Sequence, residues 1–212
     1  MIKPQGPPPR HMRLEDRQWA GLLLFAGTTQ FAIGMIIAEA VDPSYSVSTN
    51  YISDLGVRAG AAVFNTSIIL LGVTILATSW FLFRAFKDRI LMLVVLLAGV
   101  GAVGVGVFTE AFGSIHVVVS FITFLFAALS AILAFRVLRP PLSYLSALLG
   151  VASLAALGLY ISKNYLGLGN GGMERMIVYP VLTWGISFGG YLLGMSHAQG
   201  PPDAKAGGPS SH

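Results

Sequence analysis

The stretch ILMLVVLLAGVGAVGVGVF, residues 90–108, decides the fold because it contains no charged or strongly polar side chain over 19 residues. A helix needs roughly 20 apolar residues to cross the hydrocarbon core of a bilayer. The stretch also lacks the alternation of polar and apolar residues that a transmembrane β-strand requires. Five more long, predominantly apolar runs occur, at residues 19–40, 61–83, 115–137, 142–162 and 173–195. We therefore predict an all-α, polytopic integral membrane protein with six transmembrane helices.

The composition excludes a soluble globular protein. Of the 212 residues, 55% are hydrophobic and 10% are charged, whereas about a quarter of a soluble domain is charged. The mean hydropathy is +0.75. Residues 1–16 and 198–212 are rich in proline, glycine and serine, which predicts disordered tails on either side of one transmembrane domain, residues 17–197. Because the chain has no cysteine, disulfides and thiol chemistry are excluded.

The positive charges predict the orientation in the membrane. When loops are assigned alternately to the two sides, ten of the 13 Lys and Arg residues fall on the side that holds both termini. The other three are Arg58, Lys163 and Arg175. Positive residues collect on the cytoplasmic side, so we predict a multi-pass protein of the cell membrane with both termini in the cytoplasm. From this distribution we expect the basic residues to contact headgroups of the lipid bilayer. It does not indicate nucleic acid as a partner.

The longest loop, residues 41–60, is the most polar part of the predicted outer side. Its centre reads NYISDLG, residues 50–56, between two long apolar runs. We predict that it forms a short helix or a re-entrant segment at the membrane interface. In a helix, Asn50 and Asp54 are four residues apart and share a face with Ser53.

Other polar residues lie at the same predicted membrane level. Asn65 opens the second helix, Glu110 and His116 flank the turn FTEAFGSIH, and Glu174 and Arg175 begin the sixth helix. Polar groups that face lipid are unfavourable, so we expect these side chains to point inward. The sequence predicts a polar pocket open to the outside. Its candidate ligand-binding residues are Asn50, Ser53, Asp54, Asn65, Glu110, His116, Glu174 and Arg175.

Two specific arrangements are expected in this pocket. The side chains of Asp54, Asn65, His116 and Arg175 converge in one cavity. Asp54 and Arg175 form a partly buried ion pair, because Arg175 needs an acceptor at the membrane level and residues 41–60 are long enough to fold over the sixth helix. Three further residues are interpreted as ordinary headgroup-level residues: Glu39, Asp42 and Lys163.

Four segments carry a family resemblance. They are NYISDLG (50–56), FNTSIILLG (64–72), FTEAFGSIH (108–116) and GMERMIVYPVLTW (172–184), in this order. Together they resemble the archaeal and bacterial membrane-protein family catalogued as domain of unknown function 998. The resemblance covers nearly all of the chain from the first to the sixth helix, and it is most specific at residues 53–56 and at the Glu174-Arg175 pair. It implies a multi-helix membrane protein and brings no established activity.

Three functions fit the predicted pocket. The first is binding or transport of a lipid headgroup or a small polar ligand. The second is a lipid hydrolase or transferase whose carboxylates and histidine activate water or hold a divalent metal, or in which Ser53 or Ser120 acts as nucleophile with His116. The third is a structural subunit of a membrane complex. A homo-oligomer is compatible with each of these.

We predict neither a cofactor nor a bound metal. One membrane-level imidazole and no thiol do not indicate haem or structural zinc. The segment GVGAVG, residues 99–104, matches a dinucleotide-binding motif. It lies inside a predicted helix, however, and not between a strand and a helix. Its small residues are instead expected to allow close helix packing.

Overall fold

The computed structural model describes residues 14–195, and six long helices account for most of them. They are α1 (Asp16–Ala40), α2 (Ala61–Phe86), α3 (Arg89–Val107), α4 (Ser114–Leu133), α5 (Leu142–Ile161) and α6 (Gly169–Gly194). Three short 3-10 helices join them: η1 (Ser53–Val57), η2 (Glu110–Phe112) and η3 (Ala134–Arg136). All six long helices have the length and hydropathy needed to cross a membrane. The predicted all-α fold with six spans is confirmed.

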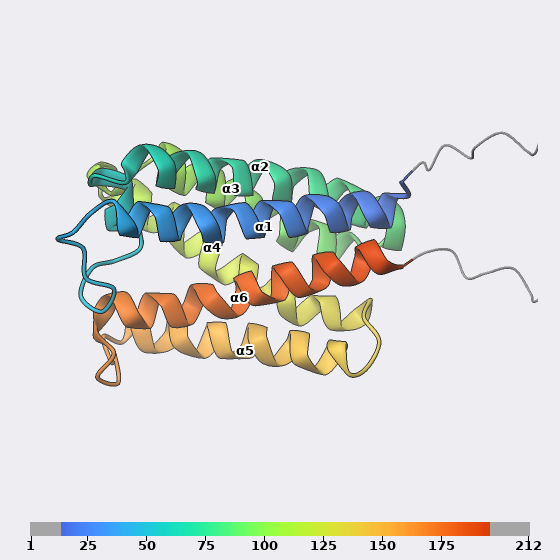
Figure 1. Cartoon of the computed structure of the whole chain (residues 1–212). Helices are drawn as coiled ribbons and strands as arrows, with labels where there is room; N and C mark the ends of the chain where they lie inside the picture. Colours follow the sequence, from blue (N-terminus) through green and yellow to red (C-terminus); the bar gives the residue numbers. More distant parts are fainter. Residues whose placement is uncertain (1–13, 196–212) are drawn as a thin grey trace, which may run out of the picture.

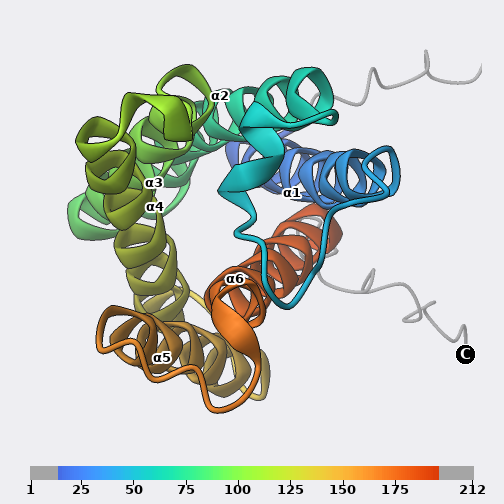
Figure 2. The same ribbon diagram turned by 90° about the vertical axis from the view of Figure 1, so that its left-hand side faces the viewer.

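The helices form a closed ring. Each helix packs against the next one in the sequence, and α6 packs against α1 (Figure 2). The described chain begins and ends at the same end of the bundle, opposite the long loop of residues 41–60, here called loop 1 (Figure 1). We call the end that carries this loop the loop-1 end. The predicted tails, residues 1–16 and 198–212, lie almost entirely outside the described residues.

Glycines bring α3 close to both of its neighbours. A Cβ atom on Gly72 of α2 would lie 2.6 Å from the backbone nitrogen of Val103. A Cβ atom on Gly101 would lie 2.8 Å from the backbone nitrogen of Thr123 in α4. Real Cβ atoms do not approach backbone this closely, so only glycine fits at these two crossings. The glycine-rich segment of α3 therefore serves helix packing, as predicted.

The sixth helix begins earlier than predicted, at Gly169 and not near residue 173. Its first turns lie against loop 1, because the backbone N–H groups of Gly171 and Gly172 donate to the Ser48 carbonyl oxygen over 3.0 and 3.3 Å. A Cβ atom on Gly171 would collide with the Asn50 carbonyl oxygen. Glu174 thus lies in the second turn of α6, which corrects the expectation that it occupies the first.

Pro180 lies inside α6, and the helix continues past it to Gly194. Pro180 lacks the N–H that would bond to the carbonyl of residue 176 in a regular helix. One residue further on, the Ser153 hydroxyl of α5 donates to the Ile177 carbonyl over 2.8 Å and ties α6 to α5.

Candidate functional site

Loop 1 is folded back on itself by Asp42. The Asp42 carboxylate accepts from the backbone N–H of Ser44 (3.1 Å) and from the Arg58 Nε (2.6 Å). The Arg58 guanidinium lowers the pKa of Asp42 to about 2, and the Ser44 hydroxyl adds to this effect. Asp42 is 7% exposed, so it is a buried ion-pair partner, a structural role that its interpretation as an ordinary headgroup-level residue did not include.

Arg175 ties loop 1 to α6. Its guanidinium donates to the Glu39 carboxylate (2.5 Å) and to the Tyr45 hydroxyl (2.6 Å). It also donates to the carbonyls of Val47 (2.9 Å) and Gly171 (3.0 Å). Arg175 is 3% exposed, and burial beside it raises the pKa of the Tyr45 hydroxyl to about 12. We call this group the arginine cluster: Glu39, Asp42, Tyr45, Arg58 and Arg175.

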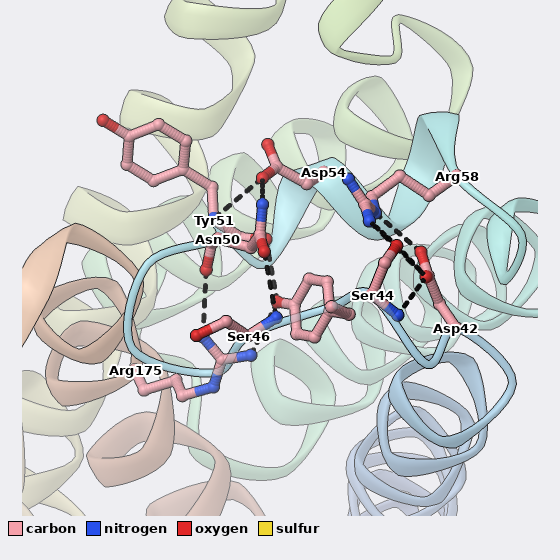
Figure 3. A network of polar contacts seen from close by, with 9 residues as sticks. Asp42, Ser44, Ser46, Asn50, Tyr51, Asp54, Arg58 and Arg175 are labelled. Atoms are coloured by element: carbon pink, nitrogen blue, oxygen red, sulfur yellow. Dashed lines mark hydrogen bonds and ion pairs between the residues drawn. The ribbon is translucent and has the colours of Figure 1, made fainter.

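The predicted ion pair between Asp54 and Arg175 is wrong. Figure 3 shows the two side chains on opposite sides of the Asn50 backbone. The Asn50 side-chain amide donates to Asp54 over 2.8 Å, whereas the Asn50 carbonyl accepts from Arg175 over 3.4 Å. The physical reason is that Glu39, at the end of α1, reaches Arg175 from the side away from Asp54. Glu39 was interpreted as a headgroup-level residue, and that interpretation is also corrected.

Three carboxyl groups face the other side of loop 1. Glu174 accepts from the backbone N–H of Ile52 over 2.6 Å and is 4% exposed. Asp54 accepts from the Tyr51 N–H over 3.1 Å as well as from Asn50. Burial, together with a hydrogen bond to Asp54, raises the pKa of Glu110 to about 7. We call Asp54, Glu110 and Glu174 the acidic cluster.

A narrow cavity of about 100 Å³ runs inside the ring of helices and reaches this cluster. Loop 1 closes one end of it with Ile52 and Ser53, and Glu174 also lines that end. Along α6 the lining continues to Trp184, ten residues further on, which corresponds to about 15 Å of helix. In the described part of the chain, α5 contributes no lining residue.

The wall of the cavity is apolar even where it carries hydroxyl groups. The hydroxyls of Thr28, Thr123 and Ser130 donate to backbone carbonyls of their own helices over 2.6 to 2.8 Å. The indole N–H of Trp184 is buried and has no hydrogen-bond partner among the described residues. Glu174 is thus the only ionisable side chain among the described residues that line the cavity.

The side chains of His116 and Asn65 form hydrogen bonds with backbone carbonyls and do not line the cavity. The Nδ1 atom of His116 lies 2.7 Å from the Phe108 carbonyl oxygen, and Nε2 lies 3.2 Å from the Ser120 hydroxyl. The Asn65 side chain donates to the Gly56 carbonyl over 2.9 Å and so fixes η1. The predicted convergence of Asp54, Asn65, His116 and Arg175 in one cavity is therefore wrong, although Ser53 and Glu174 do line the cavity.

The arrangement does not form a metal centre within residues 14–195. No three His, Asp or Glu side chains in this range come together in a way that could hold a metal ion. The enzymatic hypothesis with a divalent metal at these carboxylates has no support from the described residues.

Of the comparisons with known proteins, only the one with family models gave a match. No curated protein and no solved structure matches it. The model of the family described as "Protein of unknown function (DUF998)" matches residues 25–190, from the middle of α1 almost to the end of α6. This range includes both clusters and the whole cavity lining except Leu24. The chain is therefore a member of the family of unknown function DUF998.

Proposed function

We propose that this protein binds a single-chain amphiphile, with the apolar chain inside the helix ring and the polar head at the loop-1 end. One observation carries the proposal: a long apolar cavity whose single ionisable lining residue, Glu174, lies at one end. A ligand that is apolar along its length and polar at one end matches this distribution. A small polar solute does not match it, because most of the cavity offers it no hydrogen bonds.

The dimensions of the cavity favour a ligand with a single alkyl chain. A volume of about 100 Å³ spread over about 15 Å makes the cavity narrow, so a lipid with two acyl chains does not fit. A chain in the cavity would supply van der Waals contacts that the lining of an empty cavity lacks. Entry of the chain requires wall side chains such as Phe124 and Ile75 to move outward.

The proposal is tested with a variant that fills the cavity. Ala127 of α4 lines the cavity, whereas Ala155 of α5 is exposed on the outside of the bundle. The full-length protein and its Ala127→Phe and Ala155→Phe variants are incubated with tritiated dodecanol, and bound probe is measured by scintillation proximity. We expect Ala127→Phe to weaken binding about tenfold or more, equivalent to at least 1.4 kcal/mol, and Ala155→Phe to leave it unchanged. Equal binding by all three proteins would overturn the proposal.

A second candidate, a lipid acyl hydrolase, is favoured by the contact between Ser120 and His116. A carbonyl only accepts hydrogen bonds, so the contact with Phe108 assigns the proton to Nδ1 of His116 and leaves Nε2 to accept from the Ser120 hydroxyl. Ser120 lines the cavity. On this candidate function Ser120 Oγ attacks an ester carbonyl, its proton passes through His116 to the leaving alcohol, and water then hydrolyses the acyl-serine. A fluorophosphonate probe would label the protein and spare Ser120→Ala. Equal labelling of Ser120→Ala would exclude it.

We also propose that the loop-1 end faces the outside of the cell, as the positive charges predict. The chain has no native cysteine, so single cysteines report orientation. Ala59 of loop 1 and Lys87, between α2 and α3, lie at opposite ends of the bundle. In intact cells, an impermeant maleimide is expected to label Ala59→Cys and to leave Lys87→Cys unlabelled. The opposite pattern would invert the orientation.

A further inference from the structure

The charges around the end of the cavity are unbalanced. At the loop-1 end, Arg175 is paired with Glu39 and Arg58 with Asp42. No ion pair involves a member of the acidic cluster in the described part of the chain, and Lys163, the remaining basic residue at this end, is exposed and forms no described ion pair. Asp54 and Glu110 lie close enough together for Asp54 to raise the pKa of Glu110. Glu174 adds a third carboxyl group.

Glu174 is only partly satisfied by the protein. Its residue is 4% exposed and lines the cavity. The Ile52 N–H is the one hydrogen-bond donor that residues 14–195 supply to this carboxylate, through Oε2, so Oε1 has no donor from the protein. A buried carboxylate is stable when it is paired or fully hydrogen-bonded. A nine-tenths buried carboxylate with a free oxygen therefore indicates a missing partner in the cavity.

The surroundings of Glu174 restrict what that partner can be. Tyr51 of loop 1 and Tyr160 of α5 are in edge-to-face contact, with 6.0 Å between ring centroids. Tyr160 is close enough to Glu174 to interact with it electrostatically, as are Asp54 and Glu110. An anionic head at Glu174 would face three carboxyl groups, and Arg175, the cation that acts on Glu174, is already paired with Glu39. A cationic head would be attracted by the carboxyl groups.

From these contacts we infer that the polar head of the amphiphile is a cation, an amine or a quaternary ammonium group, held at Glu174. The inference rests on the proposed function, since it names the head of the ligand whose chain occupies the cavity. It assigns different roles to adjacent residues: Glu174 contacts the ligand, and Arg175 holds loop 1.

Three probes with the same twelve-carbon chain test the inference: dodecyltrimethylammonium, dodecanol and dodecanoate. Each tritiated probe is titrated at pH 7.5, below its critical micelle concentration, against the full-length protein in nanodiscs of zwitterionic lipid, with empty nanodiscs as blanks. We expect affinity to fall in the order ammonium, alcohol, carboxylate. The ammonium probe is attracted by the Glu174 carboxylate, whereas the alcohol carries no charge, so the ammonium probe is expected to bind about tenfold or more tightly than the alcohol.

Glu174→Gln is the matched variant, because glutamine keeps the size of the side chain and its oxygen still accepts from the Ile52 N–H. We expect it to remove the preference for the ammonium probe and to leave binding of dodecanol within about twofold. Asp54→Asn, on the same side of loop 1, provides a second test if Glu174→Gln unfolds, and it is expected to reduce the preference in part.

The outcomes separate this inference from the proposed function. If no probe binds in a way that Ala127→Phe weakens, the proposed function fails, and the inference fails with it. If all three probes bind in the cavity but dodecanoate binds as tightly as the ammonium probe, the inference alone is overturned. The same holds if Glu174→Gln leaves the preference unchanged.

Discussion

The arginine cluster and the acidic cluster both involve loop 1 and α6, and they differ in how their charges are balanced. In the arginine cluster each cation has an anion, and the Arg175 guanidinium also donates to backbone carbonyls. In the acidic cluster, Asp54 and Glu174 accept from groups of loop 1, and no ion pair involves a member of the cluster within residues 14–195. The cations of the first cluster are thus paired, whereas one oxygen of Glu174 in the second has no donor from the described residues.

This difference suggests that the arginine cluster stabilises the fold at the loop-1 end and that the acidic cluster takes part in binding. An ion-paired cluster of this kind holds two parts of the chain together, and its removal is expected to affect stability first. A partly paired cluster beside a cavity is expected to affect binding first. Adjacent positions on α6 serve both purposes, because Glu174 and Arg175 point about 100° apart around the helix.

The largest effect on stability is expected from Arg175→Gln. It leaves the Glu39 carboxylate and several loop carbonyls without their donor, and removal of one partner of a buried ion pair costs about 3–5 kcal/mol. The free energy of unfolding can be measured by titration of the purified protein with SDS. A double-mutant cycle with Glu39→Gln is expected to show strong coupling. Coupling of equal size in a cycle with Asp54→Asn would contradict the separation of the two clusters.

A smaller loss is expected from Gly171→Ala, which tests the fit of loop 1 on α6. The added methyl group collides with the Asn50 carbonyl oxygen and lies 2.7 Å from that of Val47. Overpacking of this kind costs about 1–3 kcal/mol. Gly190 is the matched control, because a Cβ atom there meets nothing within 4 Å. A melting temperature that falls equally for Gly171→Ala and Gly190→Ala would show that loop 1 does not rest on this turn.

The smallest effect is a pH dependence that belongs to the acidic cluster. Burial raises the pKa of Glu110 from 4.5 to about 7, and Asp54 adds to the shift. The folded protein therefore holds this proton more tightly than the unfolded chain, so the contribution of Glu110 to stability is full below pH 4.5 and is lost as the pH rises through 7. We expect the melting temperature to be lower at pH 8 than at pH 5.

Glu110→Gln is expected to reduce this difference between pH 8 and pH 5. Asp16→Asn, at the far end of the bundle, is expected to retain it. The groups that act on Glu110 are Asp54 and Glu174, and both are acids, so their deprotonation strengthens the effect in the same direction. An unchanged difference in Glu110→Gln would assign the pH dependence to other residues.

The fold could be predicted because hydropathy specifies which residues enter the membrane. The same is true of contacts within one turn: Asn50 bonds to Asp54, and His116 contacts Ser120, each pair four residues apart. The membrane level of a polar residue follows from its distance to the end of an apolar run. The side of the bundle toward which the side chain points does not follow from that distance. For this reason we predicted Asp54 as the partner of Arg175, whereas the structure pairs Arg175 with Glu39.

Two features left no signal in the sequence that could be interpreted in advance. The early start of α6 at Gly169 depends on loop 1, since glycines in GLGNGG are poor helix formers by themselves but allow the backbone of loop 1 to approach. The cavity is lined by single apolar residues from five helices, and such residues look the same as those that pack or face lipid. Trp184 is one of them.

Fluorescence of Trp184 tests the central claim, that an alkyl chain occupies the helix ring, most directly. The chain has three tryptophans, and Trp19 and Trp80 are 40% and 57% exposed on the outside of the bundle. Their replacement by phenylalanine leaves Trp184, 6% exposed, at the inner part of the cavity. In nanodiscs of unbrominated lipid, 12-bromododecanol is predicted to quench Trp184 with saturation, and Ala127→Phe is predicted to abolish the quenching. Absence of quenching, or quenching that is linear in probe concentration and insensitive to Ala127→Phe, would contradict the claim.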